Sequence, residues 1–146
     1  MTAPPATRHH LGVLLIDDSE DDRAAYRDVL TEAGFSVQEV ADPLSAYQQA
    51  VVDLPAIIVA DIRMPGILDG IELTRKLKVN TATRAIPIIV LTAYADDETR
   101  TEALRAGAAL FLIKPCAPDV LLAAIKRLLA SPNSSGEPVD PANISG

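Results

Sequence analysis

Residues 56–61 read AIIVAD, a continuous apolar run that stops at Asp61. Residues 13–17, VLLID, and residues 88–92, IIVLT, are short runs of the same kind, and each ends in a polar residue. A short apolar run without alternation is typical of a strand buried on both faces, as in a parallel sheet. In such sheets, sites form at the carboxyl ends of the strands. The sequence therefore predicts a buried parallel sheet with polar side chains along one edge.

Helical patterns separate these apolar runs. The expected strands are 13–16, 37–40, 56–60, 88–91 and 109–113, and the expected helices are 20–33, 43–52, 71–79, 96–106 and 118–129. Ser19 is expected to cap the first helix and Gly34 to end it. Strand–helix units joined by right-handed crossovers close into a doubly wound α/β fold. We therefore expect five parallel strands with helices on both faces.

The two ends of the chain differ in composition from its middle. Residues 1–10 contain two prolines among small or polar residues, and residues 131–146 are rich in Pro, Ser, Gly and Asn. We expect a disordered N-terminal arm over 1–10, one compact domain over 11–130, and a disordered C-terminal tail or linker over 131–146. If the chain is the whole protein, output is expected to occur by protein contact, because residues 131–146 cannot form a DNA-binding unit. A receiver cut from a longer regulator or hybrid kinase explains the sequence equally well.

Charge and hydrophobicity narrow the function classes. The 146 residues carry a formal net charge of −7, which disfavours direct nucleic-acid binding because phosphate contacts need an excess of Lys and Arg. No run reaches the roughly 18 apolar residues of a membrane span, and residues 1–10 lack the apolar core of a secretory signal. The single cysteine, Cys116, cannot form an internal disulfide. We therefore expect a cytoplasmic protein without membrane insertion.

Polar side chains follow the expected strands at their carboxyl ends. Asp17 and Asp18 follow the first strand, Asp61 the third, Thr92 the fourth and Lys114 the fifth. Carboxylates packed together raise one another's pKa unless a cation lies among them, and hard oxygen ligands suit Mg²⁺. Taken alone, the Asp17–Asp18 pair is explained equally well by a solvated loop at a helix N-terminus. The other three strand ends favour a Mg²⁺ site.

The same residues suit phosphoryl chemistry. The Asp61 carboxylate can act as a nucleophile toward an electrophile. Lys114, together with the metal, would neutralise a transferring phosphoryl group. The Thr92 hydroxyl can hydrogen-bond a phosphoryl oxygen. Asp61, Lys114 and Thr92 are therefore the catalytic candidates.

Four stretches carry a resemblance to a known family. They are LLIDDSEDDR over 14–23, IIVADIRMPG over 57–66 followed by Asp69-Gly70, PIIVLTAYA over 87–95, and AGAALFLIKP over 106–115. Over residues 11–130 the chain resembles the receiver domain of bacterial two-component response regulators, of which the chemotaxis response regulator is the familiar single-domain form. The resemblance implies a flavodoxin-like sheet in the order 2-1-3-4-5 and a phosphorylation-dependent switch. It implies no enzyme activity beyond self-phosphorylation and autodephosphorylation.

The resemblance also implies a role for each site residue. Asp61 would be the phosphoacceptor and a metal ligand. Asp18 would bind Mg²⁺ directly, and Asp17 would help through water. The backbone carbonyl of Arg63 would be a further ligand, and Lys114 would bind the phosphoryl group.

Further implications concern signalling. Thr92 would be the switch hydroxyl and Phe111 the switch aromatic, which we expect to turn inward when phosphorylated Asp61 draws Thr92 toward it. The Lys114–Pro115 bond would be cis. The phosphoryl donor would be a histidine kinase or phosphotransfer protein, and the downstream target is a protein that the sequence does not identify. A homodimer would form through the fourth helix, fifth strand and fifth helix.

The chain departs from the family pattern at three places. The loop over 64–68 has one residue more than usual, and Gly66 is expected to absorb it with a positive φ. Phe111 stands where Tyr is frequent, so the hydroxyl is missing. Cys116 and Ala117 replace an aromatic residue and an Asp or Ser. We interpret Cys116 as a small buried apolar residue.

Three alternatives share the fold. A receiver-like docking module that no longer switches would keep the same elements, but the full residue set disfavours it. A carrier of FMN needs a Ser/Thr/Gly-rich phosphate loop, whereas residues 17–22 hold five carboxylates that repel a bare phosphate. A phosphatase of the haloacid-dehalogenase type needs a second Asp two residues after its nucleophile, where this chain has Arg63.

Overall fold

The computed structural model describes residues 11–62, 69–93 and 96–130, in which strands and helices alternate. The strands are β1 (Gly12–Ile16), β2 (Ser36–Val40), β3 (Ile57–Ala60), β4 (Ile88–Thr92) and β5 (Leu110–Ile113). The helices are α1 (Glu20–Glu32), α2 (Pro43–Asp53), α3 (Gly70–Val79), α4 (Asp97–Ala106) and α5 (Pro118–Ala130). Each element lies within one residue of its expected boundaries.

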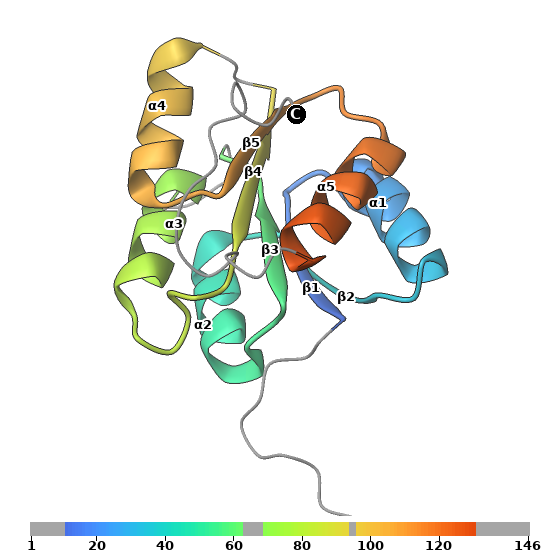
Figure 1. Cartoon of the computed structure of the whole chain (residues 1–146), viewed down its shortest axis with the longest axis horizontal. Coiled ribbons are helices and arrows are strands. Elements are labelled where there is room, and N and C mark those ends of the chain that lie inside the picture. The colour runs from blue at the N-terminus through green and yellow to red at the C-terminus, as the bar shows by residue number, and fades with distance from the viewer. Residues whose placement is uncertain (1–10, 63–68, 94–95, 131–146) are drawn as a thin grey trace, which may run out of the picture.

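The strands form one parallel sheet in the order β2-β1-β3-β4-β5 (Figure 1). The doubly wound, flavodoxin-like fold is thereby confirmed. The chain first adds β2 on one side of β1 and then returns to add β3, β4 and β5 on the other side. Such a reversal leaves a crevice outside the carboxyl ends of the two strands where it occurs, β1 and β3. The fold therefore directs attention to the ends of β1 and β3.

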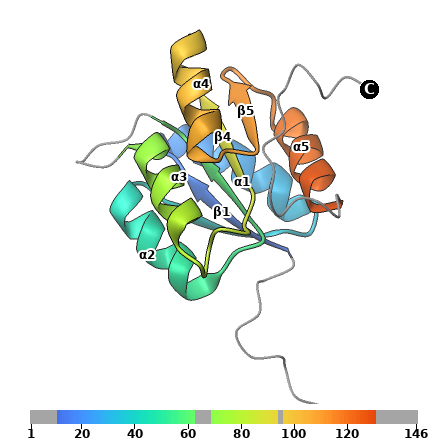
Figure 2. The same cartoon turned by 60° about the vertical axis from the view of Figure 1, so that its left-hand side comes forward.

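Helices cover both faces of the sheet (Figure 2). Along β1, Val13 and Leu15 belong to a core cluster that includes side chains of α1 and α5. The alternate residues Leu14 and Ile16 belong to a cluster that includes side chains of α2 and α3. Because both faces are buried, the strand is apolar at every position. This explains why the continuous apolar runs predict the sheet.

Side-chain caps fix the turns that lead into α1 and α3. The Ser19 hydroxyl accepts the N–H of Asp22 at 3.2 Å at the start of α1. The Asp69 carboxylate accepts the N–H of Glu72 at 2.9 Å at the start of α3. Each cap satisfies a backbone donor that the first helical turn leaves unpaired. At the other end of α1, Gly34 has φ +102°, as a residue that ends a helix in this way requires.

Helix α4 packs through small side chains. Its buried residues are Ala103 and Ala106, which join Val90 of β4 and Phe111 of β5 in a third core cluster. No helix in the described part of the chain is long and apolar enough to cross a membrane. The expected arm over 1–10, the tail over 131–146 and the longer loop over 64–68 with Gly66 lie outside the described residues and stay predictions.

Candidate functional site

Strands β1 and β3 bring two acidic residues together. The parallel register sets Ile16 opposite Ala60, and the N–H of Asp61 donates to the Ile16 carbonyl at 2.9 Å. The following residues, Asp17 and Asp61, therefore meet at the carboxyl edge, where both are buried. Carboxylate oxygens of Asp17, Asp18 and Asp61 lie within 4.8 Å of one another, with Asp18 exposed. The structure thus gathers the three carboxylates that the sequence singles out.

Lys114 follows β5, and its side chain reaches the same carboxylates at the carboxyl edge of the sheet. Its backbone N–H donates to the carbonyl of Thr92 at 2.8 Å, which aligns the end of β5 with the end of β4. Its ammonium donates to carboxylate oxygens of Asp17 at 2.6 Å, Asp22 at 2.7 Å and Asp61 at 3.0 Å. An ammonium has three donors, so these bonds use all of them.

The site holds more negative than positive charge. Burial raises the pKa of the Asp17 carboxyl, although the hydrogen bond from Lys114 opposes that effect. Burial alone would lower the pKa of Lys114, but its hydrogen bonds to Asp17, Asp22 and Asp61 outweigh burial and raise it. The lysine is therefore fully charged at neutral pH and acts as an internal counterion. Asp18 adds a fourth carboxylate beside Asp17 and Asp61, so the site holds four carboxylates and one ammonium, an arrangement that attracts a further cation.

The donor set fits magnesium. Asp17, Asp18 and Asp61 offer only carboxylate oxygens, the hard ligands that Mg²⁺ prefers. One of the three is exposed, which leaves room for the water molecules that Mg²⁺ usually keeps. The backbone carbonyl of Arg63, the further ligand that the resemblance implies, lies outside the described residues.

The first turn of α1 contributes two side chains that the sequence did not single out. Asp22 bonds to Lys114, and the Arg23 guanidinium donates to the backbone carbonyl of Asp17 while pairing with Glu39 of β2 at 3.3 Å. The position of Asp22 in the sequence could have indicated that it belongs to the site. It is the third residue of α1 and so lies in the helical turn next to the strand ends. The sequence could not say which acid of that turn faces the site, since this depends on the direction in which α1 leaves β1.

Thr92 and Phe111 lie on the neighbouring strands β4 and β5, and Lys114 follows the end of β5. Thr92 ends β4 and is fully buried. Phe111 is 4% exposed and belongs to the same core cluster as Ala103 and Ala106 of α4. The structure therefore describes Phe111 in its inward position, whereas we expected an outward position that turns inward on phosphorylation. Small alanine side chains on α4 leave space for the ring, and burying an aromatic ring is favourable.

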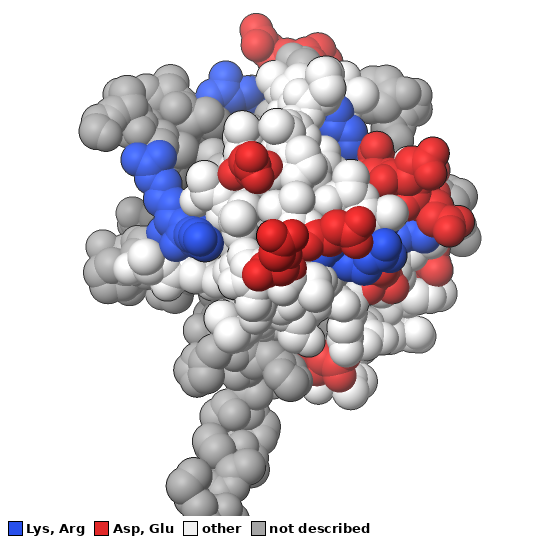
Figure 3. Space-filling view, turned by 90° about the vertical axis from the view of Figure 1, so that its right-hand side faces the viewer, with Lys and Arg blue, Asp and Glu red and all other residues white. Residues whose placement is uncertain are grey.

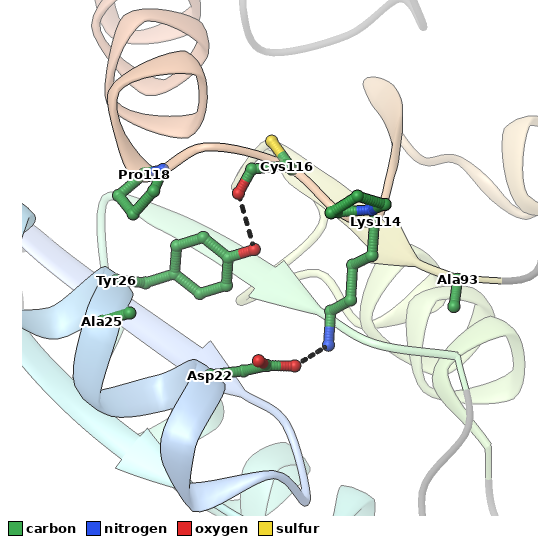
Figure 4. Close-up of a pocket in the computed structure, with 8 residues that line it drawn as sticks. Asp22, Ala25, Tyr26, Ala93, Lys114, Cys116 and Pro118 are labelled. Carbon is green, nitrogen blue, oxygen red and sulfur yellow. Dashed lines mark hydrogen bonds and ion pairs between the residues drawn. The ribbon is translucent and has the colours of Figure 1, made fainter.

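A hollow of about 410 Å³ opens beside Lys114 between α1 and the segment that follows β5 (Figure 4). The Tyr26 hydroxyl donates to the carbonyl of Cys116 at 3.0 Å and so ties α1 to that segment. The Lys114–Pro115 bond is cis, as the resemblance implies. Cys116 is half-buried against the core, and burial raises the pKa of its thiol, which makes it less reactive. The lining residues are Asp22, Ala25, Tyr26, Ala93, Lys114, Pro115, Cys116 and Pro118.

On the face that carries α1 and α5, charge is unevenly distributed. Figure 3 shows acidic side chains most densely on the right of this face, with basic side chains among them, and further basic side chains along its left edge. The acids of the first turn of α1 are Glu20, Asp21 and Asp22. The negative electrostatic potential of these acids favours the approach of cations to the site over that of bare anions.

Comparison with models of protein families assigns the chain to a known family. The family model of the response regulator receiver domain matches residues 13–126. The chain belongs to the response regulator receiver domain family. Receiver domains of two-component systems are phosphorylation-dependent signalling switches. Membership therefore removes the FMN carrier and the phosphatase as alternatives.

Among curated proteins, this receiver domain is 41% identical over 117 residues to the C4-dicarboxylate transport transcriptional regulatory protein of Pseudomonas aeruginosa. That match covers 80% of the chain and 25% of the relative. A gliding motility regulatory protein of Myxococcus xanthus is 38% identical, over 88% of the chain and 16% of the relative. The chain thus spans a quarter or less of the length of these two relatives.

Solved structures show the same architecture. A response regulator from Chloroflexus aurantiacus has a TM-score of 0.78 and 32% identity, covering 86% of the chain and all of that structure. The Vibrio cholerae chemotaxis protein CheY4 has a TM-score of 0.74 and 30% identity, covering 80% and 96%. The receiver domain of the sensor histidine kinase PA1611 from Pseudomonas aeruginosa, solved with a magnesium ion coordinated in its active site cleft, has a TM-score of 0.76 and 31% identity, covering 83% and 98%.

Proposed function

We propose that this receiver domain, over residues 11–130, accepts a phosphoryl group on Asp61 from a histidine kinase or phosphotransfer protein. The observation that carries the proposal is the meeting of Asp17, Asp18 and Asp61 with the Lys114 ammonium at one edge of the sheet. A nucleophilic carboxylate, a metal-binding acid pair and a fixed cation are the parts that phosphoryl transfer requires.

Each residue has a separate task in the proposed reaction. An Asp61 carboxylate oxygen forms a bond to phosphorus as the donor's bond to phosphorus breaks. Lys114 and the Thr92 hydroxyl bind phosphoryl oxygens. Asp17 and Asp18, with Asp61 and the backbone carbonyl of Arg63, would hold Mg²⁺. The ion, when bound, would neutralise charge on the phosphoryl oxygens.

Output by protein contact is part of the same proposal. Phe111 connects the site with α4, since its ring packs with the buried alanines of that helix. The face formed by α4, β5 and α5 exposes Ile113 of β5 and Val120 of α5. We assign to this face the downstream protein contact and a homodimer contact. The proposal places the reaction in the cytoplasm and assigns the chain no chemistry beyond self-phosphorylation and autodephosphorylation.

Intact-mass measurement tests the phosphoacceptor. With Mg²⁺ and acetyl phosphate, the wild-type protein should gain one phosphoryl group and Asp61→Asn should gain none. Asp28→Asn, which removes an exposed carboxylate further along α1, should gain one as the wild type does. Equal incorporation in Asp61→Asn and wild type would refute Asp61 as acceptor. No incorporation in any of the three would favour the docking module that does not switch.

A further inference from the structure

We infer that Asp22 is a positioning residue that restrains the Lys114 ammonium and thereby slows phosphorylation, an inference that rests on the function proposed above. Asp22 Oδ2 lies 2.7 Å from Lys114 Nζ. Figure 4 shows the Asp22 carboxylate on α1 pointing at the lysine, which crosses the gap from the end of β5. The corresponding distance between Lys114 and Asp17 is 2.6 Å, so the two bonds differ little in length.

The argument begins with the number of donors on the ammonium. Lys114 has three N–H groups, and Asp17, Asp22 and Asp61 each accept one. A phosphoryl oxygen at Asp61 needs a hydrogen bond from the same ammonium. Because no donor is spare, Lys114 can bind the phosphoryl group only after it weakens or gives up one of these bonds.

The three carboxylates differ in what happens to them during the reaction. Asp61 becomes the acyl phosphate, so the charge of its carboxylate is replaced by negative charge on the phosphoryl oxygens. Asp17 belongs to the group of acids that can hold a metal ion. Asp22 lies outside that group within the described residues. Its carboxylate is neither the proposed nucleophile nor one of these metal-binding acids, so it keeps its charge and continues to accept the hydrogen bond from Lys114.

The environment of the pair sets the size of the effect. The side chains of Lys114 and Asp22 are 13% and 43% exposed, and the hollow of about 410 Å³ lies beside them. Water reaches the pair from that side, so the bond restrains the lysine weakly compared with a buried ion pair. We expect its removal to raise the phosphorylation rate by about two- to fivefold, the range for a partly exposed pair.

Asp22→Asn tests the inference, with Asp21→Asn as its matched control. Both variants remove one carboxylate from the first turn of α1, but Asp21 is exposed. The backbone bond from Asp22 to the Ser19 cap remains in both. Phosphorylation by acetyl phosphate with Mg²⁺ is followed by intact mass. A rate in Asp22→Asn about two- to fivefold above that of Asp21→Asn supports the restraint. Equal rates in the two variants, or a slower Asp22→Asn, would overturn it.

A second measurement needs neither metal nor phosphoryl donor. In ¹⁵N-labelled protein with Mg²⁺ removed, proton exchange of the Lys114 ammonium with water is measured by NMR. Exchange should be at least about twofold faster in Asp22→Asn than in Asp21→Asn, because one of the three hydrogen bonds between the ammonium and a carboxylate is gone. Unchanged exchange contradicts the restraint even where phosphorylation proceeds. If wild type is never phosphorylated but the exchange difference is present, the proposed function fails while the Asp22–Lys114 restraint holds.

Discussion

Gly70 packs directly against the backbone of Asp61. A Cβ atom added at Gly70 would lie 2.2 Å from the carbonyl oxygen of Asp61 and 2.8 Å from the Cα of Ile62. The N–H of Gly70 also donates to the Ile62 carbonyl at 3.0 Å. The start of α3 therefore touches the end of β3, and Asp69 caps the helix at that point. This contact explains why a glycine follows Asp69 at the start of α3.

Replacing Gly70 should disturb both stability and the site. In Gly70→Ala the new methyl group must displace the backbone that carries Asp61, so we expect a loss of about 2 kcal/mol or more in unfolding free energy and slower phosphorylation. Gly34→Ala is the control, because an added Cβ there meets nothing within 4 Å. It should cost about 1–2 kcal/mol through its positive φ alone and leave the phosphorylation rate unchanged. Urea unfolding and intact mass measure both quantities, and a wild-type phosphorylation rate in Gly70→Ala would contradict the expected disturbance of Asp61.

Removing Asp18 should weaken magnesium binding. Asp18→Ala deletes one of three clustered carboxylates, so we expect Mg²⁺ affinity to fall by about tenfold or more. The metal-free protein should become more stable, by up to about 1 kcal/mol, because like charges no longer repel. Titration calorimetry and thermal unfolding check the two effects. Asp28→Ala should change the affinity little, and an equal affinity in Asp18→Ala and wild type would remove Asp18 from the ligand set.

Thr92 should be required for the response but not for phosphorylation. Thr92→Ala keeps Asp61, the acid pair and Lys114, so it should still gain a phosphoryl group. Amide NMR shifts with and without beryllofluoride, a phosphoryl mimic, should change little over residues 96–113 in the variant compared with wild type. Because Phe111 is already inward, the response is expected as a change in α4 rather than as a large movement of the ring. Shift changes as large as those of wild type would show that Thr92 is not the relay.

The unfolding free energy should rise with pH in the range where the Lys78 ammonium loses its proton. Its ammonium donates to the carbonyls of Arg84 and Ile86 at 3.1 and 2.8 Å, and burial lowers its pKa below the usual 10.5. The folded state therefore releases this proton at lower pH than the unfolded state does, so folding gains as pH rises through that window. Lys78→Met keeps an unbranched apolar stem without the charge. The unfolding free energy of wild type minus that of Lys78→Met should increase as the pH rises toward the usual lysine pKa of 10.5, and a decrease would contradict the lowered pKa.

Much of the fold could be predicted because the deciding signals are local. A continuous apolar run such as 56–60 indicates a strand with two buried faces, and Ser19 and Gly34 mark the ends of α1 by the hydrogen bonds that they can make. The placement of Asp17, Asp61, Thr92 and Lys114 at strand ends follows from the same runs. Neighbouring parallel strands in register then bring these residues to one edge.

The sequence by itself determined the order of strands and helices and the residues at the carboxyl edge, since these depend on neighbours along the chain. Tertiary structure alone decided that Asp22 bonds to Lys114, that Phe111 lies inward, and that Gly70 must lack a Cβ beside Asp61. Each of these relations joins segments separated in the chain and depends on the direction in which a helix leaves its strand. A direction of this kind is set by packing of the whole core, because close-packed side chains allow few arrangements.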